Sequence, residues 1–190
     1  MSILNKPGET IDPSTVSPWP TILRYGLIGG LVLVVYALLG NLLGFTKPSA
    51  GFVTLILSGM VVVILLYAGV MIAAVRNHQA NELGGYISFG RAMMVAFMVG
   101  LIMAIIGILF NNVYANVIEP DFVTTLLDEA EAMYEEMNMS AEQIQASLAQ
   151  LEGQYTLNGQ IIGLGMGSVF GAIMSLIIAA VMKKNPPENA

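Results

Sequence analysis

Four long apolar runs constrain this chain more than any other feature of its sequence. None of them contains an Asp, Glu, Lys, Arg or His, and they cover residues 25–43, 51–75, 92–110 and 161–182. About 20 apolar residues in an α-helix cross a hydrocarbon core of about 30 Å. A soluble domain carries about a quarter charged residues, whereas this chain carries 11% and is 56% hydrophobic. The sequence therefore predicts an all-α membrane protein with four transmembrane helices.

The segments around these runs predict the domain organisation. The first 21 residues hold four prolines together with several Ser and Thr, which is typical of a flexible tail. We therefore expect a cytoplasmic tail at residues 1–20, one four-span membrane domain at 21–183 and a second tail at 184–190. Within the domain, the predicted spans cover about residues 22–43, 51–75, 90–112 and 159–182, and a helical hairpin covers 121–156.

The basic residues predict the orientation of the chain. With a cytoplasmic N-terminus, six of the seven Lys and Arg residues fall on the cytoplasmic side, and only Lys47 falls on the other side. Lys and Arg are enriched in the cytoplasmic loops of membrane proteins. We therefore expect both termini and the loop 76–91 to lie in the cytoplasm.

The segment 111–160 lies on the opposite side in this topology and is strongly acidic. It contains nine Asp and Glu residues and no Lys or Arg. Apolar residues recur at spacings of three or four over 122–137 and over 144–155, which is typical of two amphipathic helices. Ser140 and Gln143 form a predicted capping box at the start of the second helix. The sequence thus predicts an extracytoplasmic acidic helical hairpin between the third and fourth spans.

Three roles are open for this hairpin. It is a solvated cap over the membrane domain, a surface that binds a partner, or a divalent-cation site. The glycine turn and the ligand spacing of an EF-hand are absent from it, which argues against the cation site. Its candidate interaction surface consists of Asp128, Glu129, Glu131, Glu135, Glu136 and Glu142.

The fourth apolar run carries a stripe of small residues. At every fourth position it has Gly159, Gly163, Gly167, Gly171, Ser175 and Ala179. Residues four apart lie on the same side of a helix, and small side chains there let another helix approach closely. The predicted partner is the third run, which repeats the pattern at Ala96, Gly100 and Ala104. A seam between copies of the chain, or a pore lining, is the alternative. Gly26 and Gly30 form a further GxxxG pair in the first run.

The sequence offers little for catalysis or for a cofactor. It has no cysteine and no HExxH, GxSxG or P-loop motif. Its one histidine, His78, lies near Glu82 in the loop 76–91, and we expect it to be solvated there. No ionisable residue lies in an apolar run, which argues against coupled ion transport. We predict no catalytic residue, metal site or cofactor, and the net charge of −6 argues against a nucleic-acid partner.

Three short motifs carry a resemblance to a known family. They are RYGLIGG at residues 24–30, GGYISFGRA at 84–92 and IEPDF at 118–122. With these motifs the chain resembles an uncharacterised family of four-helix membrane proteins of Bacteroidetes, catalogued as a domain of unknown function. The similarity covers about residues 20–182. The resemblance implies four spans and a location in the bacterial inner membrane, and it brings no known activity or catalytic residue.

The function that these observations favour is non-enzymatic. We expect an integral protein of the lipid bilayer that presents the acidic hairpin for interaction or assembly in the cell envelope, with an envelope protein as its partner. The alternative is a small oligomeric channel or transporter packed through the glycine stripe of the fourth span. A membrane enzyme is the third class, and no motif supports it. Oligomeric state separates the first two functions, because the alternative requires a homo-oligomer.

Overall fold

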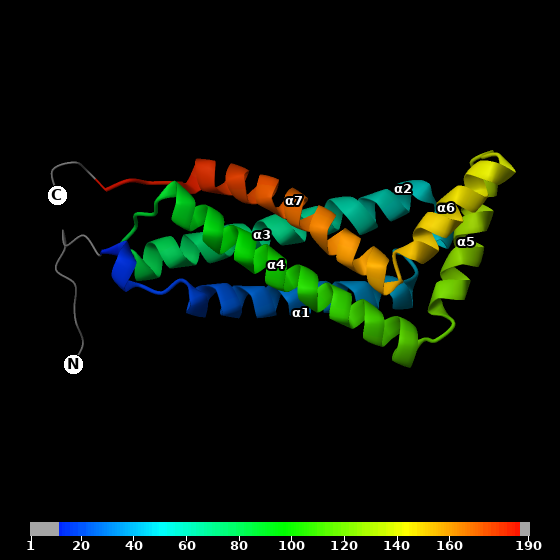
Figure 1. The fold of residues 1–190 in the computed structure, drawn as a ribbon, viewed down its shortest axis with the longest axis horizontal. Helices are drawn as coiled ribbons and strands as arrows, with labels where there is room; N and C mark the ends of the chain where they lie inside the picture. The colour runs from blue at the N-terminus through cyan, green and yellow to red at the C-terminus, as the bar shows by residue number, and fades with distance from the viewer. Residues whose placement is uncertain (1–11, 187–190) are drawn as a thin grey trace.

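Four long helices form the body of the molecule, which is described over residues 12–186 by a computed structural model (Figure 1). The first is α1 (Trp19–Leu43), and the fourth is α7 (Leu157–Met182). The second runs without a break through α2 (Phe52–Leu55), η3 (Ile56–Val62), α3 (Val63–Asn77) and η4 (His78–Glu82). The third consists of α4 (Phe89–Val113) and η5 (Tyr114–Ile118). Each of the four is long and apolar enough to cross a membrane. This confirms the predicted class of an all-α protein with four transmembrane helices.

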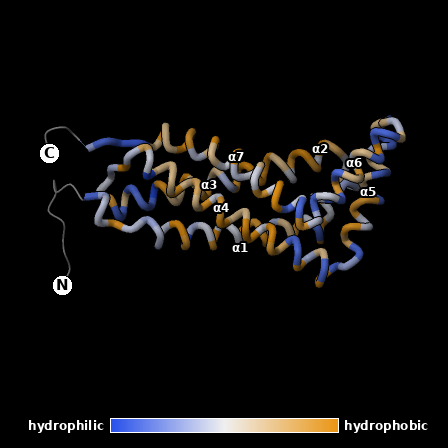
Figure 2. Tube along the Cα trace, viewed as in Figure 1, coloured by the Kyte–Doolittle hydropathy of each residue, from blue (hydrophilic) through white to orange (hydrophobic). Residues whose placement is uncertain are grey.

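Two shorter helices stand at one end of this bundle. α5 (Phe122–Glu136) and α6 (Ala141–Gly153) form a hairpin at the end opposite to the two described chain ends (Figure 1). The long helices are mostly apolar, whereas hydrophilic residues gather in the hairpin and at the opposite end of the bundle (Figure 2). Short turns η1 (Pro13–Thr15) and η2 (Pro48–Ala50) complete the described elements. Most of the predicted tails, 1–11 and 187–190, lies outside the described residues.

Two of the spans extend further than the sequence predicts. The second helix continues past Val75 to Glu82, and the third continues past residue 112 to Ile118. The predicted second span ends where charged residues begin, but no Gly or Pro follows before Gly84 to break the helix. The predicted loop 76–91 therefore shrinks to the residues between Glu82 and Phe89.

α1 and α4 make a close helix–helix contact. A Cβ atom built at Gly26 lies 2.8 Å from the Cβ of Ile102, and one built at Gly30 lies 2.9 Å from the Cβ of Ile106. These distances are too short for real Cβ contacts, so glycine is required for the two helices to approach in this way. Beside this contact, α4 buries Ala96 completely in the core of the bundle. The GxxxG pair of the first span is therefore a packing seam inside the chain.

From Gly163 onward, the small-residue stripe of α7 divides into an open part and a buried part. Ser175 and Ala179 are fully buried, as predicted for a packing face. By contrast, a Cβ atom added at Gly163, Gly167 or Gly171 meets no atom within 4 Å. The predicted close contact with the third span is therefore absent at these three glycines, and a seam between copies stays a prediction.

The physical reason lies in the helix opposite the stripe. Gly100 and Ala104 of α4 line the same space as the glycines of α7. Two facing rows of small residues leave a void unless the two backbones meet. Beside the glycines of α1, in contrast, isoleucine side chains of α4 fill the space. An added Cβ at Gly100 would meet only Met71, at 3.6 Å, which is an ordinary contact distance.

Candidate functional site

The hairpin of α5 and α6 is held together by its own apolar face. Ala130, Met133 and Ile144 are buried between the two helices and their surroundings. The predicted capping box is present, because the Ser140 side chain accepts from the backbone of Gln143 and the Gln143 side chain accepts from the backbone of Ser140. The capping box and the small apolar seam between α5 and α6 therefore position the carboxylates of the hairpin.

One of the predicted surface carboxylates has a different role. Oε2 of Glu129 accepts hydrogen bonds from the backbone N–H of Ser49, at 3.2 Å, and from its hydroxyl, at 2.7 Å. Ser49 belongs to η2, which connects the first and second spans. Glu129 is only partly exposed and anchors the hairpin to the membrane domain. It is therefore a positioning residue and does not form part of a free interaction surface.

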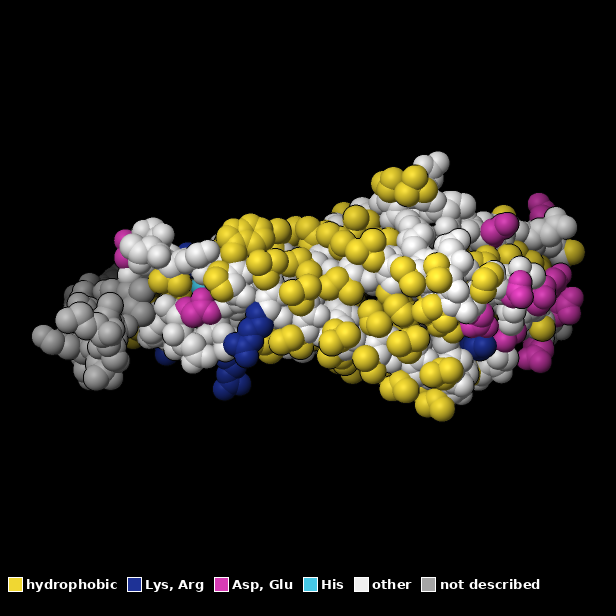
Figure 3. Space-filling model, turned by 90° about the horizontal axis from the view of Figure 1, so that it is seen from below, with side chains coloured by type: hydrophobic (Ala, Val, Ile, Leu, Met, Phe, Trp, Pro, Cys, Tyr) yellow, Lys and Arg dark blue, Asp and Glu magenta, His cyan; other side chains and the backbone are white. Residues whose placement is uncertain are grey.

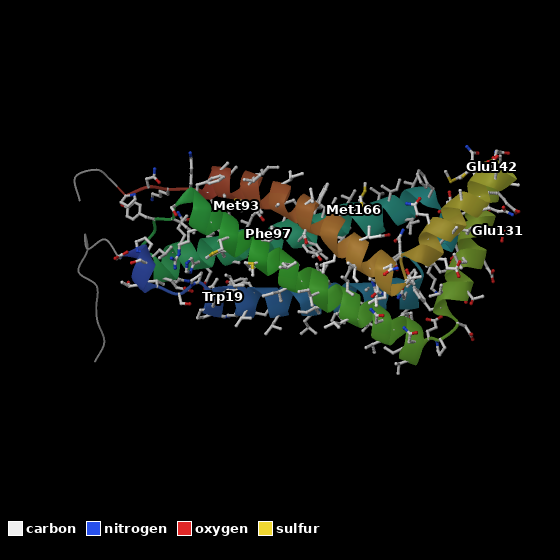
Figure 4. All side chains as sticks on the ribbon, viewed as in Figure 1. Trp19, Met93, Phe97, Glu131, Glu142 and Met166 are labelled. Carbon is white, nitrogen blue, oxygen red and sulfur yellow. The ribbon has the colours of Figure 1, made fainter. Side chains whose placement is uncertain are left out.

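The other five predicted carboxylates form what we call the acidic surface: Asp128, Glu131, Glu135, Glu136 and Glu142. All five are exposed, and within residues 12–186 none of them takes part in an ion pair. Acidic side chains gather at the hairpin end of the molecule, beyond a broad band of hydrophobic side chains (Figure 3). Glu131 and Glu142, on the two helices of the hairpin, both stand at this end (Figure 4).

A chain of aromatic rings fixes the base of the hairpin. The rings of Tyr114 and Phe122 lie edge to face at 5.1 Å between centroids, and those of Phe122 and Tyr155 at 5.9 Å. The Tyr114 hydroxyl donates to Oε2 of Glu119 at 2.7 Å. Burial raises the pKa of the Tyr155 phenol above its ordinary value, because the charged form loses hydration. The hairpin thus continues the packing of the third span across the turn at Glu119.

The connection from α6 to α7 is equally tight. A Cβ atom at Gly159 would lie 1.9 Å from the carbonyl oxygen of Gly153, so this position of the stripe does require glycine. The Thr156 hydroxyl caps α7 by accepting from the Gly159 N–H at 3.1 Å. The side-chain amides of Asn112 and Gln160 exchange hydrogen bonds of 2.8 and 3.2 Å between the third and fourth spans. The hairpin is therefore anchored at both of its ends.

A polar cluster lies at the opposite end of the bundle, and His78 is its centre. The prediction of a solvated loop histidine is wrong, because His78 is 0% exposed. Its Nδ1 lies 2.7 Å from Oε2 of Glu82, and Nε of Arg91 donates to its Nε2 at 2.9 Å. Arginine can only donate hydrogen bonds, so Nε2 of His78 is the acceptor. The ring proton is therefore on Nδ1, which donates a hydrogen bond to Glu82. Both ring nitrogens are therefore occupied.

The same cluster ties four segments together. The Arg91 guanidinium also donates to the carbonyl oxygens of Pro13, at 2.6 Å, and of Val16. The Thr21 hydroxyl donates to the second carboxylate oxygen of Glu82. Every polar atom in the cluster has a partner, which is typical of a structural network. The spacing of His78 and Glu82, four residues apart, is the signal that would have predicted their pairing on an extended helix.

A groove runs beside the glycines of α7. α4 and α7 line both of its ends, η3 and α3 line the inner end, and α6 with the α6–α7 connection lines the end beside the hairpin. It holds two adjoining cavities, of about 810 Å³ toward the hairpin and about 410 Å³ further along α7. Tyr67, Ala104 and Gly167 line both cavities, so the two cavities adjoin at these residues. We call this space the α7 groove.

Within the described part of the chain, no group of three or more His, Asp and Glu side chains is placed to hold a metal ion.

Known proteins add a family but no activity. No curated protein and no solved structure matches the chain. One family model does match, over residues 24–184, and its description is "Protein of unknown function (DUF4199)". This match covers most of the sequence and includes all three motifs noted above, so the chain is a member of the DUF4199 family of proteins of unknown function.

Proposed function

We propose that this membrane protein is non-enzymatic and presents its acidic hairpin outside the cytoplasm, where the acidic surface binds a basic protein of the cell envelope. The observation that carries the proposal is the combination of five exposed carboxylates with a rigid attachment. Glu129, the aromatic chain and the α6–α7 connection each hold the hairpin against the membrane domain. A surface that is already ordered loses less entropy when a partner binds.

The charge of the acidic surface supports a basic partner. Glu131 and Glu135 are one helical turn apart, and like charges at this spacing repel by a few tenths of a kcal/mol. The segment between the third and fourth spans supplies no Lys or Arg that offsets this repulsion. A positively charged partner removes the repulsion on binding, so complementary charge contributes to both affinity and rate of association.

The non-enzymatic part of the proposal rests on the only histidine of the sequence. Both ring nitrogens of His78 are engaged by Glu82 and Arg91, so the ring has no free atom to act as a general base. The acidic surface lies on the hairpin, at the other end of the bundle.

The orientation is proposed from the basic residues and is tested by reporter fusions. Six of seven Lys and Arg residues favour a bacterial inner-membrane topology with both chain ends in the cytoplasm and the hairpin in the periplasm. A reporter active only in the periplasm should work after Leu127 and fail after Lys184. Periplasmic activity after Lys184 would reverse the proposed orientation.

The binding role is tested with the full-length protein in cells. One variant replaces the five carboxylates by amides: Asp128→Asn, Glu131→Gln, Glu135→Gln, Glu136→Gln and Glu142→Gln. The matched control exchanges Asp and Glu at the same five positions and keeps the charge. In-cell crosslinking should recover a basic partner with the wild type and the control, and at least tenfold less of it with the amide variant.

Two further results decide the matter. The yield of partner should fall as salt rises, because charges on a surface are screened beyond about 8 Å at physiological ionic strength. An unchanged yield with the amide variant, at equal amounts of inserted protein, would reject the proposal. The hairpin would then be a solvated cap.

A further inference from the structure

We propose that the α7 groove binds one membrane lipid, with an acyl chain in its inner cavity and a zwitterionic headgroup at its mouth beside the hairpin. This site is separate from the acidic surface, so the proposal holds whether or not the hairpin binds a protein.

The groove has the length of a lipid chain and opens to the outside of the bundle. Its lining on α4 runs from Phe97 to Asn111. Fourteen helical residues rise about 21 Å, which is more than half of a hydrocarbon core of about 30 Å. The side chains of Met60 and Phe170, on η3 and α7, are 55% and 56% exposed. The groove is therefore accessible from the side where the bilayer lies.

Glycines from three elements face this space without being needed by the chain itself. Gly59 belongs to η3, Gly107 to α4, and Gly167 to α7. All three line the groove, and a Cβ added at any of them meets nothing within 4 Å. Glycine in a helix costs about 1 kcal/mol relative to alanine in water. Since no contact within the chain requires these glycines, the space that they leave is available to another molecule.

Both cavities have largely apolar linings, but polar side chains gather at the end of the groove beside the hairpin. The mouth next to the hairpin is lined by the amide side chains of Asn111, Gln150, Gln154 and Asn158. The inner cavity is lined by apolar side chains such as Met71, Phe97, Leu101 and Met174. Methionine side chains are flexible and adapt to irregular apolar ligands. This gradient matches an amphiphile whose polar end lies at the membrane surface and whose chain lies in the hydrocarbon region.

Charge selects the headgroup. No charged side chain of the described residues lines either cavity, and amides supply both donors and acceptors for a phosphate and its substituents. Residues 111–160, which include the hairpin, carry nine carboxylates and no Lys or Arg. An anionic headgroup would be repelled there, whereas the ammonium group of a zwitterionic lipid would be attracted.

The experiment uses the full-length protein, purified in a mild detergent and examined by native mass spectrometry. Phosphatidylethanolamine and phosphatidylglycerol, which are zwitterionic and anionic, are added separately. Gly167→Leu fills the groove where its two cavities meet. Gly165→Leu is the matched control, because Gly165 is on the same helix, has equally free space around it and does not line the groove.

We expect one tightly bound phosphatidylethanolamine per chain and at least fivefold weaker binding of phosphatidylglycerol. Gly167→Leu should reduce the bound lipid at least fivefold without lowering the melting temperature of the delipidated protein, and Gly165→Leu should change neither. Equal lipid binding by both variants would overturn the site. Equal binding of the two lipids would overturn the headgroup preference. Dimers that Gly167→Leu dissociates would show that a second copy fills the groove, and would also reject the proposal.

Discussion

Nε of Arg91 donates a hydrogen bond of 2.9 Å to Nε2 of His78, across the loop that joins the second and third spans. Because His78 belongs to η4 and Arg91 to α4, this bond fixes the end of one span to the beginning of the next, and Glu82 holds the other nitrogen of the same ring. The remaining guanidinium nitrogens of Arg91 hold the carbonyls of Pro13 and Val16 in front of α1. This end of the bundle is therefore closed by one polar network centred on a buried imidazole.

We predict that His78→Phe destabilises the protein by about 1–3 kcal/mol, because Arg91 and Glu82 each lose the buried imidazole as a partner and keep only their other hydrogen bonds. Thermal unfolding in detergent measures the change. Asn81→Ala is the control, since Asn81 is exposed in the same helical segment. Equal melting temperatures for His78→Phe and the control would show that the network contributes nothing to stability.

A second prediction concerns the seam between α1 and α4. Gly26→Leu and Gly30→Leu should each lower stability by about 2 kcal/mol or more, because the new side chains meet Ile102 and Ile106 across a closed contact. Gly69→Leu provides the comparison on α3, where an added Cβ meets nothing within 4 Å. Should all three variants unfold at the same temperature in detergent, the seam is not a close contact.

The turn between α6 and α7 supports a third prediction. Gly159→Ala places a methyl group against the backbone carbonyl of Gly153, which has no side-chain freedom to move away. We expect a loss of about 1–3 kcal/mol and faster hydrogen exchange in α6, whose attachment is strained. Gly163→Ala, one turn further along, should cause neither effect because its surroundings are open. Unchanged exchange in Gly159→Ala would contradict the geometry of this turn.

The fourth prediction concerns alkaline pH. Burial raises the pKa of Tyr155 in the folded protein, so above about pH 10 the unfolded chain releases a proton that the folded protein keeps. Stability therefore falls as the pH rises through this range. Tyr155→Phe, which lacks the ionisable group, should lose less stability between pH 9 and pH 11 and should match the wild type at pH 7. Unfolding curves that shift in parallel for both proteins would disprove the link.

The acidic hairpin illustrates how much of a candidate site is readable from sequence. Its carboxylates and its capping box depend on residues within one helical turn of each other, and the sequence predicts both. The role of Glu129 depends on Ser49, 80 residues earlier in the chain, and no local pattern indicates that pairing. Sequence analysis therefore locates the surface but does not separate its exposed carboxylates from the one that anchors it.

The glycines of α1 and α7 show the same division more sharply. The sequence by itself determined four membrane-crossing helices, because span length and apolar character are properties of each segment alone. It presented equivalent small-residue patterns in the first and fourth spans. Only the tertiary structure decided that Ile106 packs against Gly30 while Gly167 borders a groove. The packing at each glycine depends on the size of the side chain opposite it, and the crossing of the helices determines which side chain that is.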